Sequence, residues 1–362
     1  MNAKIKSLSV IACLLLQFCL HAQSIPPVTI HVEKAGNLRH LIPASDKYWI
    51  TDLTLTGNLN GKDIRFIREM AGRSHDNDVT YGMLSTLNLA GANIVRGGDS
   101  YYSGQKTSDN CLGNYMFYNC SKLTSITLPA GITSIGKYAL GGCHGLTSIT
   151  IPGGVTSIGY YAFSRCYRLR GVTIPGGVGN IADGLFYACS GLKSISIPDG
   201  VTDIGYCAFN YCYGLTSVTI PSSVGVIGEN SFDGCRALSD IYLKSPAPPH
   251  LDVYCFNDVN KANCKLHVPR GSSSAYRLAW DFGNVIEDNP TSTIPVAKES
   301  AGIRSIPNGI AIEITEKTAI SIFNLSGREV YHSVINGNTE IRLNKGAYIV
   351  RLDNRSEKII VN

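Results

Sequence analysis

The stretch KYALGGCHGLTSITIPGGVTSIG, from Lys137 to Gly159, is one copy of a 23-residue unit that decides the fold. DGLFYACSGLKSISIPDGVTDIG, from Asp183 to Gly205, repeats it two copies later. The copies run from residue 114 to residue 251, and a cysteine marks each one at positions 120, 143, 166, 189, 212 and 235. One unit of this length cannot bury its own apolar face, so the copies must stack into a solenoid.

Each position of the unit has a structural role. In the second copy the alternation Ile149-Thr150-Ile151 predicts a short strand, which Pro152 ends because proline cannot donate to a strand ladder. Val155 and Ile158 predict a second inward-facing extended piece, and Gly159 is expected at the corner of the coil. The pattern therefore predicts a mainly β, right-handed coil in which each copy adds one strand to a parallel sheet, about 4.8 Å from the last.

The cysteine column has two interpretations. A disulfide framework would suit an exported protein, but side chains in one register stand parallel, and a disulfide needs converging Cβ vectors. We therefore predict reduced, buried thiols that act as small apolar residues. Outside the column, Cys111 and Cys207 are left open, and a bridge between Cys255 and Cys264 is an alternative. No histidine recurs near any column cysteine, which argues against a catalytic thiol.

The frame C-x-x-L-x-x-I-x-L-P-x-x-I-x-x-I-G at residues 120–136 resembles the BspA-like, or Treponema pallidum-type, leucine-rich repeats of bacterial surface proteins. The resemblance covers the six copies and their degenerate flanks. It implies a leucine-rich-repeat solenoid at the cell surface with an adhesive role, and it brings no catalytic motif.

The chain on either side of the repeats has its own signals. Residues 1–22 have the charged start and short apolar run of a signal peptide, and no other stretch is long enough to predict a transmembrane helix. Residues 23–113 predict an irregular leucine-rich-repeat cap with a helix near residues 62–72. Residues 252–288 predict a capping coil that ends in a helix at 272–280, where Tyr276 and Trp280 would cover the last coil.

The C-terminal part has a different pattern. Residues 289–306 are polar, carry Pro290 and Pro295, and are interpreted as a linker. Residues 307–362 predict a small all-β sandwich of short alternating strands. The segments ISIFNLSGREV, IRLNKGAYIVRL and KIIV resemble the sorting domains of the Bacteroidetes type IX secretion system, which implies the secretion machinery as a partner.

Charge and motifs exclude several functions. Without residues 1–22, which hold two of the 32 basic and none of the 27 acidic residues, the net charge is about +3, too balanced for a nucleic-acid partner. The sequence lacks a P-loop, a dinucleotide fingerprint and the G-x-S-x-G and H-E-x-x-H motifs, so we expect no enzyme and no cofactor. Asp76-Asn77-Asp78 opens like a calcium loop, but Leu87 occupies its twelfth position, so we expect no metal.

Two surfaces remain as candidates for binding. The strand face should present a uniform row of hydroxyl side chains, which suits a solvated strand better than specific recognition: Thr127, Thr150, Thr173, Ser196, Thr219 and Tyr242. The opposite turn side concentrates tyrosine and arginine, the types enriched at protein interfaces, in the third and fifth copies. Its candidate ligand-binding residues are Tyr160, Tyr161, Arg165, Tyr167, Arg168, Tyr206, Tyr211 and Tyr213.

The sequence thus predicts a secreted or surface-displayed bacterial protein that recognises an extracellular protein, in the manner of an adhesin. Two alternatives stay open. One is a carbohydrate-binding accessory protein, because tyrosine faces also suit sugar rings. The other is a self-associating structural component of the surface. The turn-side tyrosines also have a plainer interpretation, in which they only cover the apolar arc of the coil.

Overall fold

The computed structural model describes residues 25–288, 301–306, 309–314, 318–324, 329–335, 339–352 and 355–361. The chain divides into two compact units, Met1–Pro290 and Thr291–Asn362. The expected signal peptide at 1–22 and residues 289–300 of the expected linker lie outside the described residues.

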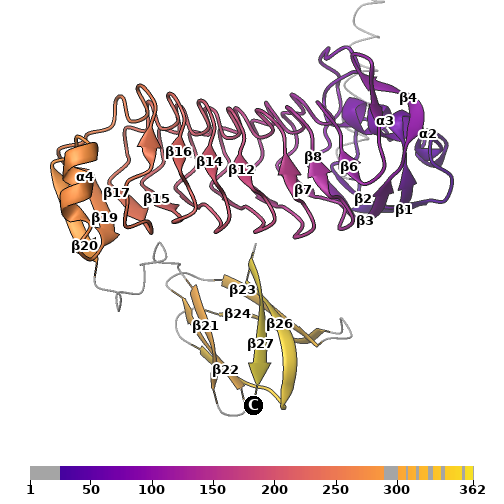
Figure 1. The fold of residues 1–362 in the computed structure, drawn as a ribbon. Coiled ribbons are helices and arrows are strands. Elements are labelled where there is room, and N and C mark those ends of the chain that lie inside the picture. Colours follow the sequence, from indigo (N-terminus) through magenta and orange to yellow (C-terminus); the bar gives the residue numbers. More distant parts are fainter. Residues whose placement is uncertain are drawn as a thin grey trace, which may run out of the picture. The chain divides into compact units, whose positions relative to one another are not determined.

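One side of the first unit, the strand face, carries one short parallel strand from each coil (Figure 1). Within the repeats, equivalent residues of successive copies pair, as Ser125 does with Ser148 and Ile126 with Ile149. The strands of this face are, in order, β1 (Val28–Val32), β2 (Asp52–Leu59), β3 (Thr86–Ile94), β7 (Ser125–Thr127), β9 (Ser148–Thr150), β11 (Gly171–Thr173), β13 (Ser194–Ser196), β15 (Ser217–Ile220), β17 (Asp240–Leu243), β19 (Lys265–Pro269) and β20 (Asn284–Asp288). The predicted solenoid with its parallel strand face is confirmed.

The strand face consists of two sheets, where the sequence suggested a single one. The first sheet ends at β11 and the second begins at β13. At this boundary β11 carries Gly171 and the half-buried Val172, whereas β9 carries Ser148 and the buried Ile149. β20 is a further departure, because the capping coil was expected to end in the helix at 272–280, and β20 instead follows that helix and extends the sheet by one more parallel strand.

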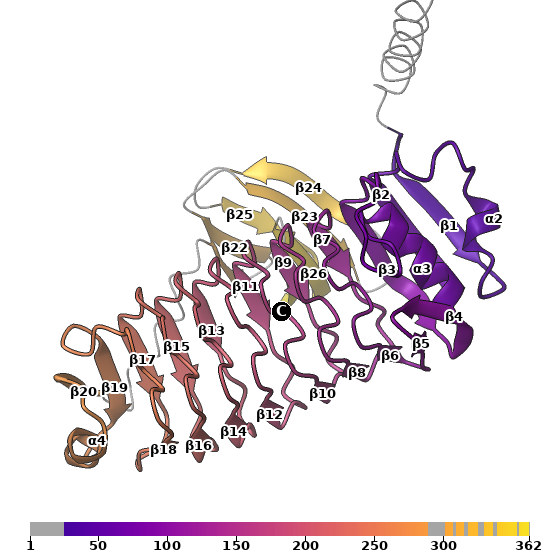
Figure 2. The same cartoon turned by 90° about the horizontal axis from the view of Figure 1, so that it is seen from above.

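A second row of two-residue strands runs along the coils (Figure 2). Its inward residues follow the predicted pattern, since Val155 and Ile158 are buried. The row consists of β6 (Cys111–Leu112), β8 (Ser134–Ile135) and β10 (Ser157–Ile158), then β12 (Asn180–Ile181), β14 (Asp203–Ile204), β16 (Val226–Ile227) and β18 (His250–Leu251).

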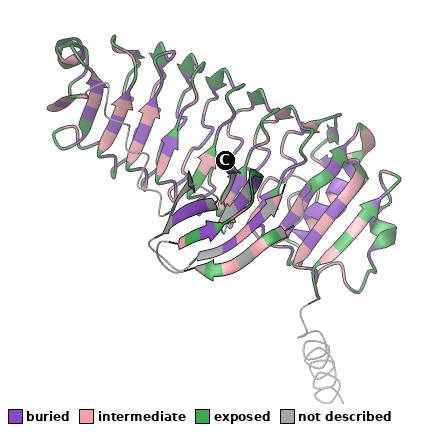
Figure 3. Cartoon of the chain, turned by 90° about the horizontal axis from the view of Figure 1, so that it is seen from below, coloured by how far each residue is buried: buried purple, intermediate pink, exposed green. Residues whose placement is uncertain are grey.

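The core repeats with the coil, so that like side chains stack on like. The rings of Phe163 and Phe186 stack with centroids 5.6 Å apart, and the stack continues through Phe209, Phe232 and Phe256. Figure 3 shows buried positions recurring from strand to strand along the coils. One apolar cluster therefore runs from Val32 to Val285, through the described part of the first unit.

The cysteine column is reduced and buried, as predicted. Every cysteine within residues 25–288 is a free thiol, Cys255 and Cys264 included, so the alternative bridge between those two is absent. The sulfur of Cys189 lies 3.1 Å from the carbonyl oxygen of Phe163, and the same contact recurs along the column. Burial raises the pKa of Cys189 to about 12, so the thiol stays protonated and inert at neutral pH.

The turn side has its own backbone ladder, which the sequence did not predict. Tyr115, Phe117 and Asn119 each donate an N–H to the next coil, to the carbonyl oxygens of residues 137, 139 and 141. Two positions of each coil adopt positive φ. The first is occupied by Tyr115, Tyr138, Tyr161, Gly184, Cys207, Asn230 and Tyr254, and the second by Asn119, Gly142, Arg165, Ala188, Tyr211, Gly234 and Asp258.

The corner glycine therefore has a different role from the expected one. Gly159 is not among the residues with positive φ. A Cβ on Gly159 would instead lie 2.6 Å from the backbone nitrogen of Lys137 in the preceding coil. Glycine is required here because two backbones pass closely, and the reversal of the chain falls on the two left-handed positions.

The N-terminal cap ends the turn-side ladder with side chains. It contains α2 (Leu38–Leu41), α3 (Gly61–Met70) and the hairpin of β4 (Gly97–Tyr102) and β5 (Gln105–Thr107). The fully buried Arg68 of α3 donates to the carbonyl oxygens of Met116 and Tyr118. The hydroxyl of Tyr101 donates to the carbonyl oxygen of Asn114. In the repeats, the equivalent carbonyl oxygens accept hydrogen bonds from backbone N–H groups of the preceding coil.

The C-terminal end of the solenoid is covered by α4 (Ser273–Ala279) and the residues after it. Tyr276 and Trp280 are buried, and the Trp280 ring lies 5.5 Å from Phe256, the last member of the phenylalanine stack. The apolar end of the core is thereby closed.

The second unit is a small antiparallel sandwich. Its sheets have the strand orders β21-β22-β25 and β24-β23-β26-β27. Ile310, Ile312 and Ile341 of the first sheet share a core with Ile320 and Ile322 of the second. The strands are β21 (Ala301–Ile306), β22 (Gly309–Ile314), β23 (Thr318–Asn324), β24 (Glu329–Ile335), β25 (Thr339–Arg342), β26 (Gly346–Leu352) and β27 (Arg355–Val361).

β21 corrects the expected linker, because Ala301–Ile306 pairs antiparallel with β22 over its full length. The linker interpretation rested on Pro290 and Pro295, which both lie before this strand and outside the described residues. Strand pairing with β22, a tertiary contact, determines the conformation of this stretch.

Candidate functional site

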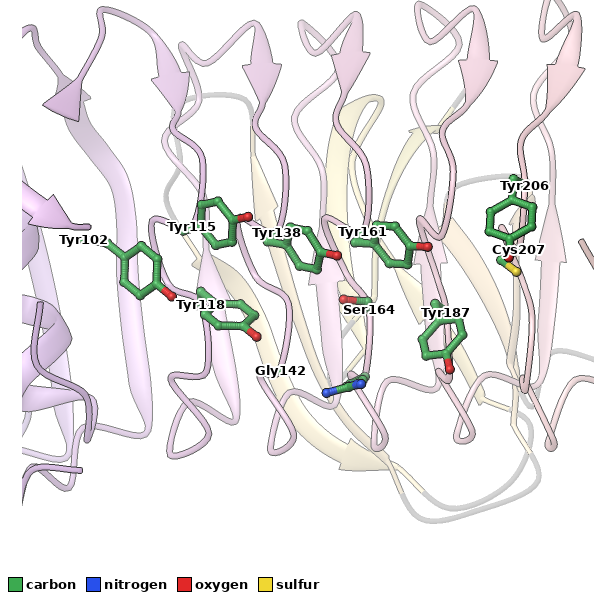
Figure 4. Close-up of a pocket in the computed structure, with 11 residues that line it drawn as sticks. Tyr102, Tyr115, Tyr118, Tyr138, Gly142, Tyr161, Ser164, Tyr187, Tyr206 and Cys207 are labelled. Atoms are coloured by element: carbon green, nitrogen blue, oxygen red, sulfur yellow. The ribbon is translucent and has the colours of Figure 1, made fainter. Parts of the chain in front are cut away.

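Four tyrosines on the turn side form a stacked row, the tyrosine ladder: Tyr102, Tyr115, Tyr138 and Tyr161 (Figure 4). Successive ring centroids are 5.1, 5.1 and 5.0 Å apart, and the planes are 5–19° from parallel. Three of these residues occupy the first left-handed position of successive coils, so their side chains leave the backbone in the same direction.

The ladder stops at Tyr161 because the next coil carries Gly184 at this position. A Cβ on Gly184 would lie 2.1 Å from the Tyr161 ring, so the ring packs on the glycine backbone. At the other end the guanidinium carbon of Arg68 lies 4.9 Å from the centroid of the Tyr102 ring. The buried arginine that caps the backbone ladder thus also supports the tyrosine ladder.

A second row lies beside the ladder, three residues further along each coil. Tyr118 and Tyr187 occupy this row three coils apart, and Gly141 and Ser164 fill the two positions between them. Tyr118 meets the rings of Tyr115 and Tyr138 at 89° and 84°. The small residues leave a hollow between two aromatic rings.

The two rows enclose a groove of about 640 Å³, the tyrosine groove. This volume is in the range of small-ligand sites. The residues that line it are Tyr102, Tyr115, Tyr118, Tyr138, Gly142, Tyr161, Ser164, Arg165, Tyr187, Tyr206 and Cys207. Within the described chain its lining carries one formal charge, on Arg165.

Several phenol groups of the groove have a raised pKa and stay protonated at neutral pH. Burial raises the pKa of Tyr138, Tyr161 and Tyr187 above the usual 10.0. A hydrogen bond with Cys207 raises the pKa of Tyr206 to about 12. The groove therefore presents neutral hydroxyls that can both donate and accept hydrogen bonds.

The structure brings only part of the predicted turn-side set into the groove. Of those eight residues, Tyr161, Arg165 and Tyr206 line it. The other five lie outside its lining: Tyr160, Tyr167, Arg168, Tyr211 and Tyr213.

Ring contacts nevertheless connect the third and fifth copies. Tyr187 lies 6.0 Å from Tyr161 and 5.7 Å from Tyr211, which in turn lies 5.8 Å from Tyr213. Tyr167 is not part of this series of rings, and its ring stacks on that of His144 with centroids 4.8 Å apart. A continuous line of rings therefore runs from the N-terminal cap to the fifth copy.

Sequence reasoning missed five of the seven tyrosines that line the groove: Tyr102, Tyr115, Tyr118, Tyr138 and Tyr187. The signal was present for four of them. Tyr115 and Tyr138 precede Tyr161 by two periods and one period of 23, and Tyr118 precedes Tyr187 by three periods. Tyrosine density within a single copy does not reveal these columns, because their members lie in different copies. Tyr102 belongs to the cap and lies outside the repeat frame.

The strand face differs from the groove in shape and chemistry. Thr127, Thr150 and Thr173 are exposed at the predicted outward positions. At its C-terminal end the imidazole of His267 lies 2.9 Å from a carboxylate oxygen of Asp240 and 3.3 Å from one of Asp288. The described residues contain no cluster of His, Cys, Asp and Glu side chains able to hold a metal ion.

Comparisons with known families identify two segments. Residues 110–239 match the family described as BspA type leucine rich repeat region, in six copies. Residues 307–362 match the secretion system C-terminal sorting domain. Neither family is a catalytic one. Comparison with curated proteins gave no match.

Solved structures of leucine-rich-repeat proteins are also similar. A T. pallidum leucine rich repeat protein is 25% identical, with 49% of this chain and 80% of that chain covered, at a TM-score of 0.37. A leucine rich cell surface protein of Faecalibacterium prausnitzii is 22% identical over 55% and 65% of the two chains, at a TM-score of 0.34. The pneumococcal vaccine antigen PcpA is 18% identical over 66% and 57%, at a TM-score of 0.42.

Across the described residues, no helix has both the length and the apolar character needed to cross a membrane.

Proposed function

We propose that the chain is exported to the bacterial surface to bind an extracellular protein, because residues 110–239 match the BspA-type leucine-rich repeats and residues 307–362 match the secretion-system sorting domains. In this proposal residues 1–22 direct export across the inner membrane, residues 307–362 engage the secretion machinery, and the solenoid carries the recognition surface.

The observation that carries the proposal is the line of tyrosine rings along the turn side. Tyr167, Tyr211 and Tyr213 expose 43%, 37% and 46% of their surface. Rigid tyrosines supply contact area at a low cost in conformational entropy, and a nearby arginine adds directed hydrogen bonds. A partner that lies along the axis could contact several coils at once.

A binding measurement with the purified chain tests the proposal. We expect it to bind at least one protein on an array of extracellular matrix proteins, and Tyr167→Ala and Tyr211→Ala each to weaken that binding by about 1–2 kcal/mol. Thr150→Ala and Thr173→Ala on the strand face are the matched controls and should change little. If the threonine substitutions abolish binding and the tyrosine substitutions do not, the recognition surface is the strand face.

Two other functions remain candidates. A carbohydrate-binding accessory protein would bind members of a glycan array, and the neutral hydroxyls of the groove support this alternative. A self-associating surface component would sediment as concentration-dependent oligomers and bind neither array. We propose no enzymatic activity and no bound cofactor, since neither matching family is catalytic.

A further inference from the structure

The shape of the tyrosine groove restricts which ligands it can bind. The inference drawn from this shape rests on the protein-binding function proposed above. Tyr118 and Tyr187 stand three coils apart, about 14 Å at the spacing of parallel strands. Gly141 and Ser164 occupy the two positions between them in this row, and Ser164 and Gly142 line the groove. The hollow is therefore a slot with an aromatic ring at each end and the tyrosine ladder along one side (Figure 4).

The ladder carries a row of hydroxyls beside this slot. Tyr115 and Tyr138 have a stacked ring on both faces. Figure 4 shows the hydroxyls of Tyr115, Tyr138 and Tyr161 pointing the same way, at successive steps of the ladder. A ligand along the solenoid axis therefore meets a row of phenol groups that repeats about every 5 Å, the spacing of the coils.

This surface disfavours two common kinds of ligand. A peptide that adds as a β-strand needs free backbone donors, but the N–H groups of Tyr115, Phe117 and Asn119 already donate to the next coil. A sugar ring commonly packs on an open aromatic face, and the inner ladder faces are covered. Among the described residues, no carboxylate or carboxamide lines the groove to bind sugar hydroxyls.

A left-handed polyproline segment meets these constraints. Its three-residue turn advances about 9.3 Å, close to the roughly 10 Å of two ladder steps. Its carbonyl groups make no internal hydrogen bonds, so they are free to accept from protonated phenols. Proline rings pack between aromatic side chains in other aromatic-lined grooves.

We propose that the tyrosine groove binds a proline-rich, polyproline-II segment of the extracellular partner. The prolines fill the slot over Gly142 and Ser164, between Tyr118 and Tyr187. The backbone carbonyls of the segment accept hydrogen bonds from the hydroxyls of Tyr138 and Tyr161.

Fluorescence anisotropy of a labelled decaproline peptide with the full purified chain tests this proposal. Ser164→Tyr fills the slot with a residue that the same row already carries at Tyr118 and Tyr187, and should weaken binding at least about tenfold. Tyr138→Phe removes one hydroxyl and keeps the ring stack, and should weaken binding about threefold to tenfold. Tyr160→Phe, outside the groove lining, is the matched control and should leave the affinity unchanged.

The outcomes separate this inference from the function on which it rests. Decaproline that fails to bind, or that binds Ser164→Tyr as well as the native chain, overturns the inference even if a matrix protein is still bound through Tyr167 and Tyr211. If a β-linked oligosaccharide binds the native chain and Ser164→Tyr abolishes that binding, the groove is a glycan site instead. A chain that binds neither decaproline nor any matrix protein contradicts both proposals. Thermal melts of the variants by circular dichroism verify that they fold.

Discussion

Removal of the buried guanidinium of Arg68 should destabilise the whole N-terminal end of the solenoid. Arg68 is fully buried, and it donates to the carbonyl oxygens of Tyr115, Met116, Tyr118 and Ser74 at 3.1–3.3 Å. The substitution Arg68→Met keeps most of the side-chain volume and removes both nitrogen atoms that donate these four hydrogen bonds.

The magnitude follows from two opposing contributions. Hydrogen bonds from a charged donor contribute about 1.5–3 kcal/mol each, and Nη1 shares two N–H groups among three carbonyl oxygens, so the three N–H groups in use contribute about 4.5–9 kcal/mol. Burial of the guanidinium charge costs several kcal/mol, which the methionine variant recovers. The variant is left with buried carbonyls lacking their donors, and we expect its free energy of unfolding to fall by about 3–5 kcal/mol.

Urea unfolding followed by tryptophan fluorescence measures this loss at the correct end of the molecule. The chain has two tryptophans, Trp49 in the N-terminal cap and Trp280 at the other end. In a Trp280→Phe background, Trp49 reports the cap alone, and in a Trp49→Phe background Trp280 reports the opposite end. Because each coil contacts only its neighbours, Arg68→Met should shift the Trp49 transition more than the Trp280 transition.

Arg65→Met is the matched control on the same helix. Arg65 is 38% exposed, and its Nε atom lies 3.8 Å from Glu69, so this loss should stay below about 0.5 kcal/mol. A typical single hydrogen bond contributes about 1 kcal/mol. If the free energy of unfolding of Arg68→Met lies within about 1 kcal/mol of the native value, the capping role assigned to Arg68 is refuted.

Three further predictions concern the repeats. Ala188 has a φ of 57°, so Ala188→Gly should stabilise the chain by about 0.5–1 kcal/mol in urea unfolding, whereas Ala130→Gly should destabilise it; a loss from Ala188→Gly would contradict the strain argument. Cys189, with its pKa raised to about 12 by burial, should resist iodoacetamide in the native chain and react once urea unfolds it; rapid native labelling would show that the column opens. Burial alone would raise the pKa of Asp240, but hydrogen bonds from His267 and a serine hold it below the usual 3.8. The Asp240 carboxylate therefore stabilises the fold above pH 3.8 and loses this contribution as the pH falls through the lowered pKa, so Asp240→Asn should weaken the acid dependence of unfolding, and an unchanged acid limb would argue against the contact.

The groove shows how far the repeat pattern predicts a site. Tyr161, Arg165 and Tyr206 were identified because tyrosine is dense in their copies, and the structure places them in one groove. Tyr160 and Tyr167 come from the same dense copy and lie outside its lining. Neighbours in one copy point in different directions, whereas residues one period apart share an orientation. Column membership is therefore the better predictor of a shared site on a solenoid.

The 23-residue period encodes the coil, its parallel strands and its reduced cysteine column, because a fixed period places each copy in the same environment as the copy before it. The sequence also predicted a sorting domain at residues 307–362, the segment that the family comparison matches, whereas the folded sandwich includes β21 from Ala301 onward. The other features depend on contacts between coils. The left-handed backbone of Tyr115, Tyr138 and Tyr161 depends on bonds between coils, and these bonds turn three scattered tyrosines into a stack. Arg68 caps carbonyls that lie nearly fifty residues further along the chain. Such contacts depend on which surfaces the stacked coils bring together. Local residue patterns do not show which residues distant in the sequence will meet.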